Sequence, residues 1–228
     1  MGFRKFLLLA LSFMLLLGGI GAVYGEEREE VILSFPDVAD HHWAHPYTTK
    51  LALQGIILGD HLGQFNPDQH VRQQDAIIMA INFMGLGSTI FDSESSAVLP
   101  FQVDNYARPY VQLALDIGLL DAREELSADE EEEEIWGRQS ASREWVAKIT
   151  IRAIQQEDEA LALSSRNAPF TDNEAIADWA LGYINRAVDL DIVSGFEDGE
   201  FKPKGLVTRA QMAVFLSRSE TYLRHVPD

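Results

Sequence analysis

The sequence predicts an all-α protein built from three tandem helix–loop–helix repeats. Two stretches carry the same residues at a constant offset of 136 positions, with no gap between the paired positions. Each stretch continues into apolar spacing typical of an amphipathic helix. An internal repeat of this kind indicates small units that pack on one another rather than one large domain. The matching pairs are Trp43 and Trp179, Ala44 and Ala180, Tyr47 and Tyr183, Ile56 and Ile192, Gly59 and Gly195, Gly63 and Gly199, Phe65 and Phe201, Pro67 and Pro203, and Val71 and Val207.

A weaker third copy lies between the two strong ones. It begins at Tyr106, in place of tryptophan, and its spacing to Arg143 is 37 residues, against 30 from Trp179 to Arg209. The seven extra residues predict an insertion in a solvated loop around the acidic run 130–134, where added length costs little entropy. The predicted repeats are residues 34–88, residues 99–160 with the insertion near 124–138, and residues 168–220.

Residues 1–25 are predicted to be a secretory signal peptide. A basic pair, Arg4 and Lys5, precedes an apolar run over 6–20, and small residues before Glu26 offer a cleavage site. The run has the upper length of a signal-peptide core and is short for a membrane span. The alternative is an uncleaved membrane anchor. We expect a secreted protein without membrane contact after cleavage, and without disulfides because the chain has no cysteine.

The charge of the chain limits its partners. Thirty-six acidic residues against 18 basic ones give a net charge of −18. So strong an excess of acid opposes nucleic acid or an anionic membrane as a general partner. Any anionic ligand would have to be held by local cationic groups.

The first repeat shows how each unit is expected to fold. A first helix is predicted over 43–54, and Gly55 is placed to end it. Ile56 and Ile57 form a short apolar segment that can bury, before a glycine-rich loop. A second helix is predicted over 71–84. The apolar faces are Trp43, Tyr47, Leu51 and Gln54 in the first helix, and Ala76, Ile77, Ala80, Ile81 and Met84 in the second.

The third repeat marks the start of its second helix clearly. Thr208 and Gln211 have the spacing of a capping box, so Arg209 begins the helix. Positive charge at this end opposes the helix dipole. A residue that costs stability there suggests another use, such as joining the free N–H groups in holding an anion. Ser142 and Arg143 repeat the arrangement in the middle unit.

These motifs resemble those of the surface-layer homology (SLH) family. Family repeats open with Phe-x-Asp-Val, continue with Trp-Ala and a Gly-x-Phe-x-Pro loop, and reach Thr-Arg-Ala-Glu. The opening motif stands here at 35–38 and 170–172, and the final motif at 208–211. The resemblance covers residues 35 to about 218, strongly in the first and third repeats and weakly in the middle one. It implies an all-helical pseudo-threefold module with grooves between adjacent repeats.

The resemblance also implies a function at the bacterial envelope. SLH repeats hold proteins non-covalently by binding secondary cell wall polysaccharides linked to peptidoglycan, typically ones with pyruvylated N-acetylmannosamine. Other envelope or S-layer proteins are further candidate partners. Carried over by resemblance, Arg209 and Arg143 would hold the pyruvyl carboxylate, Trp43 and Trp179 would wall the sugar, Asp37 and Asp172 would accept bonds from sugar hydroxyls or fix the groove, and Gly59 and Gly195 would let the backbone come close.

Departures from the family pattern reduce the number of expected binding grooves. Gln73 stands where the first repeat would have its arginine, and Arg72 occupies the cap position. In the middle repeat, Tyr106 replaces tryptophan and Ala122 replaces the glycine. Loss of one charged hydrogen bond costs about 1.5–3 kcal/mol. We therefore expect one good groove, built on the third repeat.

Structural explanations remain open for the same residue types. Trp43 and Trp179 can be core residues. Asp37 and Asp172 of the opening motif can cap the entry to the first helix of their repeats. The two arginines can pair with nearby acids.

The sequence predicts neither a cofactor nor an enzyme. His41, His42 and His45 lack an acidic or cysteine partner at a metal-site spacing, and the run 130–134 lacks the pattern of a calcium loop. No nucleophile or phosphate-loop motif is present, and only about ten residues follow the third repeat. The alternative to glycan binding is an SLH-fold scaffold or adaptor that has lost the glycan and contacts another envelope protein.

Overall fold

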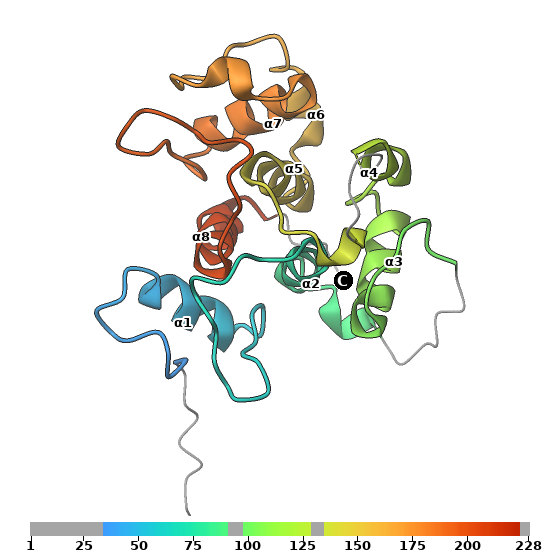
Figure 1. Cartoon of the computed structure of the whole chain (residues 1–228), viewed down its shortest axis with the longest axis vertical. Helices are drawn as coiled ribbons and strands as arrows, with labels where there is room; N and C mark the ends of the chain where they lie inside the picture. The colour runs from blue at the N-terminus through green and yellow to red at the C-terminus, as the bar shows by residue number, and fades with distance from the viewer. Residues whose placement is uncertain (1–33, 91–97, 129–134, 224–228) are drawn as a thin grey trace, which may run out of the picture. The chain divides into compact units, whose positions relative to one another are not determined.

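The helices found are those of three consecutive repeats (Figure 1). The computed structural model describes residues 34–90, 98–128 and 135–223, which belong to one unit, Ile32–Asp228. The predicted signal peptide and the acidic run 130–134 lie outside these residues. No helix in the described part of the chain is long and apolar enough to cross a membrane.

The described residues form eight α-helices and five short 3-10 helices, and no strand, which confirms the all-α prediction. The α-helices are α1 (His45–Leu53), α2 (Gln73–Phe83), α3 (Arg108–Asp116), α4 (Ala122–Ala128), α5 (Arg143–Ala153), α6 (Glu157–Leu161), α7 (Asp178–Asp189) and α8 (Arg209–Ser219). The 3-10 helices are η1 (Gly87–Thr89), η2 (Asn105–Ala107), η3 (Trp136–Arg138), η4 (Asn173–Ala175) and η5 (Glu220–Tyr222).

The repeats are joined in a cyclic order. The second helices, α2, α5 and α8, lie together in the middle, and the first helices, α1, α3 and α7, lie around them (Figure 1). Each second helix packs on the first helix of the next repeat. We call these contacts the 1–2 junction (α2 with α3), the 2–3 junction (α5 with α7) and the 3–1 junction (α8 with α1).

Three backbone hydrogen bonds close this cycle at the N-terminal ends of the central helices. The N–H of Val71 donates to Val207 (2.9 Å), that of Val207 to Ala141 (3.0 Å), and that of Ala141 to Val71 (2.9 Å). The first residue of each central helix donates in the opposite cyclic direction. These bonds run from Gln73 to Gln139 (2.8 Å), from Arg143 to Gly205 (2.9 Å) and from Arg209 to Gln69 (2.8 Å).

Most local signals in the sequence correspond to the structure. Gly55 follows α1 with φ +70°, in the left-handed region that glycine adopts freely. Ile56 and Ile57 are buried. The Thr208 capping box is present in full. The second helix of the first repeat starts at residue 73 rather than 71, because Val71 has joined the hydrogen-bonded ring.

The predicted apolar face of α1 is partly wrong. Trp43 is 54% exposed, and the buried residues are Ala44, Thr48 and Leu51. The helix begins only at His45, so Trp43 precedes its first turn and does not follow its periodicity.

The described ends of the insertion near 124–138 are helical, whereas the run 130–134 predicted as a solvated loop lies outside the described residues. The first part of the insertion belongs to α4 and the last part to η3. Glu125 of α4 is only 3% exposed, because indole N–H groups and a lysine bond to its carboxylate. The insertion therefore adds a helix that packs against the middle repeat.

Candidate functional site

The two predicted arginines each begin a central helix. Arg143 starts α5 and Arg209 starts α8, each after an extended N-cap residue, Ser142 or Thr208, whose side chain accepts a backbone hydrogen bond. Each guanidinium thus branches from the helix end where backbone N–H groups have no partner within the helix. Each side chain then crosses its junction to the next repeat.

At the 3–1 junction, the Arg209 guanidinium is held by the first repeat. Its Nε donates to the carbonyl oxygen of Phe65 (2.6 Å) and its Nη2 to that of Leu58 (3.0 Å). The guanidinium carbon lies 4.8 Å from the centre of the Phe65 ring. This is a cation–π contact, which keeps the charge over an aromatic face.

At the 2–3 junction, Arg143 makes equivalent contacts. Its Nη2 donates to the carbonyl oxygen of Ser194 (2.9 Å), and its guanidinium carbon lies 4.9 Å from the centre of the Phe201 ring. Ser194 and Phe201 are the residues 136 positions after Leu58 and Phe65. Two of the three junctions therefore carry the same arginine arrangement.

Neither guanidinium forms an ion pair with a carboxylate in the described residues. Burial lowers the pKa of Arg143 to about 10, with a further contribution from Arg218. Burial also lowers the pKa of Arg209, although Asp75 opposes the shift. The Nε of Arg143 is buried and has no hydrogen-bond partner in the described part of the chain. Pairing with nearby acids therefore does not account for these two residues.

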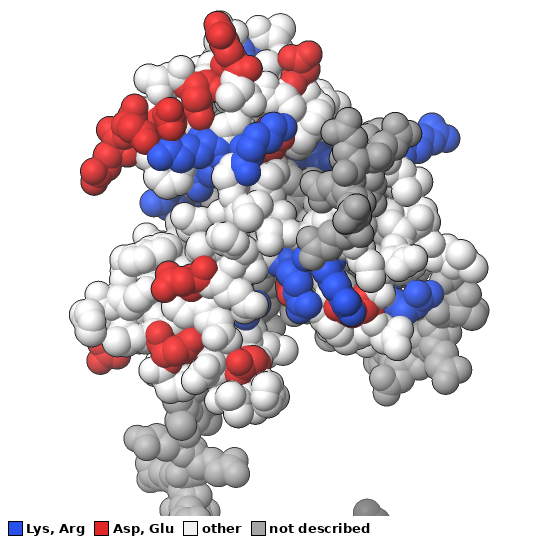
Figure 2. All heavy atoms as spheres, in the orientation of Figure 1, with Lys and Arg blue, Asp and Glu red and all other residues white. Residues whose placement is uncertain are grey.

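On the face that Figure 2 shows, basic side chains lie near the middle of the view, beside the acidic cluster at the upper left, and at the right edge. In a chain with a net charge of −18, the partly buried guanidiniums of Arg143 and Arg209 are local positive centres that form no ion pair within the described residues.

The 1–2 junction has a different composition. Gln73 begins α2, and its Oε1 is buried with no hydrogen-bond partner among the described residues. Arg72 turns aside, bonding Asp75 (2.8 Å) and the hydroxyl of Tyr106 (2.9 Å). That hydroxyl donates to Asp75 (2.7 Å). Burial and this bond raise the pKa of Tyr106 to about 12. Arg72, the arginine just before α2, is therefore already paired.

Two of the departures noted in the sequence meet at this one junction. Gln73 lies at the start of α2, and Tyr106 lies just before α3, the helix on which α2 packs. Ala122 follows α3 in the same repeat. The expectation of a single good groove assigned each groove to one repeat, and the number of grooves that bind stays a prediction. Two junctions keep their arginine.

The predicted aspartates hold the loops that carry the aromatic rings. Asp37 accepts hydrogen bonds from the N–H groups of Phe65 (2.8 Å) and Asn66 (2.6 Å). Asp172 makes the equivalent two bonds in the third repeat, both at 2.8 Å. Neither side chain caps a helix. The aspartates thus set the position of each ring under the arginine of the neighbouring repeat.

The predicted glycines sit at close approaches within these loops. A Cβ on Gly59 would lie 2.9 Å from the backbone carbon of Gly63. A Cβ on Gly195 would lie 3.0 Å from the Phe170 ring. Each glycine therefore permits loop closure, whatever its role toward a ligand.

The two predicted tryptophans are not core residues. Trp43 is 54% exposed and stacks on His42, with ring centres 5.5 Å apart. Trp179 is 47% exposed and lies over Lys148, whose Nζ is 4.9 Å from the ring centre. The interpretation of both as core residues is wrong, whereas their role as sugar walls stays a prediction. Sequence reasoning missed Lys148 of α5.

Comparison with protein families gives a clear assignment. The model of the S-layer homology domain matches residues 34–77 and 169–213, the first and third repeats. The chain contains two S-layer homology repeats. Between the two matched SLH repeats, α3 and α5 form the first and second helices of a third unit. SLH domains indicate cell-wall binding, so the protein's place is at the cell surface.

Several curated proteins contain a region similar to this chain. An endoglucanase from Bacillus sp. (strain KSM-635) is 26% identical over 206 residues, which is 87% of this chain and 20% of that protein. An amylopullulanase from Thermoanaerobacterium thermosulfurigenes is 25% identical over 183 residues, 80% of this chain and 9% of that protein. An S-layer protein from Bacillus thuringiensis subsp. finitimus is 20% identical over 190 residues, 82% of this chain and 21% of that protein. The chain spans about a fifth or less of each.

Proposed function

We propose that this SLH protein binds an anionic secondary cell wall polysaccharide at the 2–3 and 3–1 junctions. A secreted protein held in this way is anchored non-covalently to the bacterial envelope. The observation that carries the proposal is the pair of partly buried guanidiniums, Arg143 and Arg209, which have no carboxylate partner among the described residues.

The chemistry of the two junctions suits a carboxylate on a sugar. A buried cation attracts an anion more strongly than an exposed one, because water screens it less. A guanidinium has five N–H donors, and the bonds of Arg209 to the first repeat use only its Nε and Nη2 groups. The helix N-terminus adds partial positive charge. An exposed tryptophan in the same repeat as each aromatic ring offers an apolar face for a sugar ring. A pyruvylated N-acetylmannosamine combines both features.

We also propose that the protein acts as a binding module without catalysis of its own. Its similarity to enzymes is confined to a small share of each of those proteins. Arg143 and Arg209 are suited to hold an anion rather than to transfer a proton.

The test is co-sedimentation of the purified protein with cell walls before and after chemical removal of the secondary polymer. We expect binding to intact walls, loss of binding after removal, and competition by soluble pyruvylated N-acetylmannosamine but not by its pyruvate-free form. Binding that survives polymer removal would contradict the proposal.

A scaffold or adaptor role is the second candidate. It is favoured by the 1–2 junction, where Arg72, Asp75 and Tyr106 satisfy one another and leave no free cation among them. Absence of wall binding, together with capture of an envelope or S-layer protein, would support this role instead.

A further inference from the structure

The ring of Trp179 at the 2–3 junction lies over a buried ammonium group. The Nζ of Lys148 is 4.9 Å from the centre of the ring, and the lysine side chain is only 6% exposed. Trp179 itself is 47% exposed. The ring therefore has a fixed cationic neighbour in the protein and a large accessible surface.

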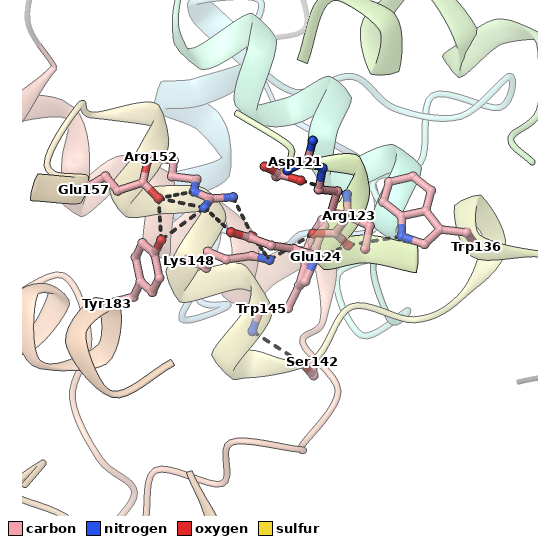
Figure 3. Close-up of polar contacts among 11 residues, drawn as sticks. Asp121, Arg123, Glu124, Trp136, Ser142, Trp145, Lys148, Arg152, Glu157 and Tyr183 are labelled. Atoms are coloured by element: carbon pink, nitrogen blue, oxygen red, sulfur yellow. Dashed lines mark hydrogen bonds and ion pairs between the residues drawn. The ribbon is translucent and has the colours of Figure 1, made fainter. Parts of the chain in front are cut away.

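The inserted helix α4 holds this ammonium group in place (Figure 3). Lys148 donates to Glu125 at 2.9 Å and to Glu124 at 3.1 Å. A buried ammonium is tolerated only when it is paired, because it has lost its water. Two of its three N–H groups bond to the carboxylates, and the ring of Trp179 faces the same ammonium.

Further bonds fix the two carboxylates themselves. Glu125 accepts from the indole N–H groups of Trp136 (3.1 Å) and Trp145 (2.9 Å). Glu124 accepts two bonds from Arg152, at 3.0 and 2.9 Å. Arg152 also bonds Glu157 and the hydroxyl of Tyr183 in α7 (Figure 3). The network thus ties α4 to α5 and α5 to the third repeat.

Backbone contacts place Trp179 along the same face of α5. Glu144 and Lys148 are four residues apart, hence neighbours on one helical face. Glu144 accepts a hydrogen bond from the N–H of Ala177 (3.2 Å), two residues before Trp179. Arg143, next to Glu144, extends to the loop that follows α7. Trp179 and Arg143 are therefore held by the same first turns of α5.

This arrangement is particular to the 2–3 junction. Counting five positions from the start of each central helix gives Lys148 in α5, Ile78 in α2 and Val214 in α8. Among the described residues, Lys148 is the one charged side chain at this position. Trp43, the counterpart of Trp179, stacks instead on its neighbour His42.

We propose that the inserted helix α4 serves glycan binding at the 2–3 junction through Lys148. Glu124 and Glu125 hold the ammonium against Trp179, and Lys148 fixes that ring as the wall on which the sugar stacks. A ring that is ordered before binding loses less conformational freedom when the ligand arrives. Lys148 is a positioning residue, since it acts through Trp179. The proposal rests on the proposed function.

A double-mutant cycle on wall binding tests the proposal. Wild type, Lys148→Met, Trp179→Ala and the double variant are titrated with purified polymer-bearing cell walls. We expect Lys148→Met to weaken binding about three- to tenfold, the cost of ordering one side chain. In the Trp179→Ala background, the same substitution should change binding by less than about twofold, because its partner is gone. Lys50→Met, which removes a lysine paired with Glu220 elsewhere, is the matched control.

Each outcome has a separate meaning. Failure of the wild type to bind contradicts the proposed function itself. Binding by the wild type with an unchanged Lys148→Met variant, or with equal losses in both backgrounds, overturns the role of Lys148 alone. Urea unfolding of each variant establishes that it is folded. If Lys148→Met does not fold, the Glu125→Gln/Lys148→Met variant, which removes both buried charges, replaces it in the cycle.

Discussion

The guanidinium of Arg209 donates a hydrogen bond to the carbonyl oxygen of Phe65, 144 positions earlier in the chain. The bond joins the third repeat to the first. Arg143 joins the second repeat to the third in the same way, at Ser194. Each proposed ligand-binding arginine is therefore also a contact between repeats, so its substitution has to be measured for both binding and stability.

Removal of either arginine should weaken wall binding. Each of Arg143→Ala and Arg209→Ala deletes a charged hydrogen bond to the ligand, of about 1.5–3 kcal/mol, which corresponds to about ten- to hundredfold in affinity. We expect the larger loss at Arg143, because Asp75 offsets part of the charge of Arg209. Co-sedimentation with polymer-bearing walls measures the effect.

Arg166→Ala is the control for these two variants, since this guanidinium already pairs with Asp189. Undiminished binding by the Arg143→Ala/Arg209→Ala variant would exclude both junctions as the glycan site.

Substitution of the loop aspartates should lower stability. Asp37→Asn and Asp172→Asn each remove a charged acceptor of two backbone N–H groups. We expect each variant to lose about 1–3 kcal/mol in the free energy of unfolding, measured with urea. A variant of unchanged stability that no longer binds walls would show that the carboxylate contacts the sugar instead of holding the loop.

Glu125→Gln should be among the most destabilising single substitutions in α4. It leaves the buried ammonium of Lys148 without its least exposed counter-charge, at a cost of about 3 kcal/mol. Thermal and urea unfolding measure the loss. Glu174→Gln, at an exposed position, should change stability by less than about 0.5 kcal/mol. Equal stability of both variants would mean that the Glu125 network contributes nothing.

Acid should destabilise the protein partly through Glu124. Burial raises the pKa of this carboxyl, but hydrogen bonds and charge from Arg152 and Lys148 outweigh it and leave the pKa below the usual 4.5. The unfolded chain then takes up a proton first as the pH falls. The stabilisation is present above the unfolded pKa and is lost as the pH falls through the folded value.

Urea unfolding from about pH 7 to about pH 3 should therefore show a shallower loss of stability for Glu124→Gln than for the wild type. Parallel curves for the two proteins would contradict this assignment.

Features that depend on neighbours in the chain were predictable. The Thr208 capping box and the helix end at Gly55 follow from spacing and from backbone preference. The exposure of Trp43 was not, because a residue just before a helix follows no helical period. Its spacing to Tyr47 and Leu51 is typical of one helical face. Because α1 begins only at His45, Trp43 does not belong to that face.

Features that depend on the cyclic order of the repeats could not be predicted from the sequence. Gln73 and Tyr106 are in different repeats, and only the packing of α2 on α3 brings them into one junction. Glu125 is one acid within an acid-rich segment, and its charge gives no sign of burial. Trp136 and Trp145 were the available signal, since each buried indole N–H needs an acceptor.

The hydrogen bonds through Val71, Ala141 and Val207 close the three repeats into a cycle, so none of them is a terminal repeat. Open arrays of repeats can grow by one unit, and they need terminal units with polar outer faces. In a closed ring each repeat covers its neighbours, so a fourth copy has no place and a missing copy uncovers two faces at once. The diverged middle repeat is consequently indispensable to the other two, even if no ligand ever touches it.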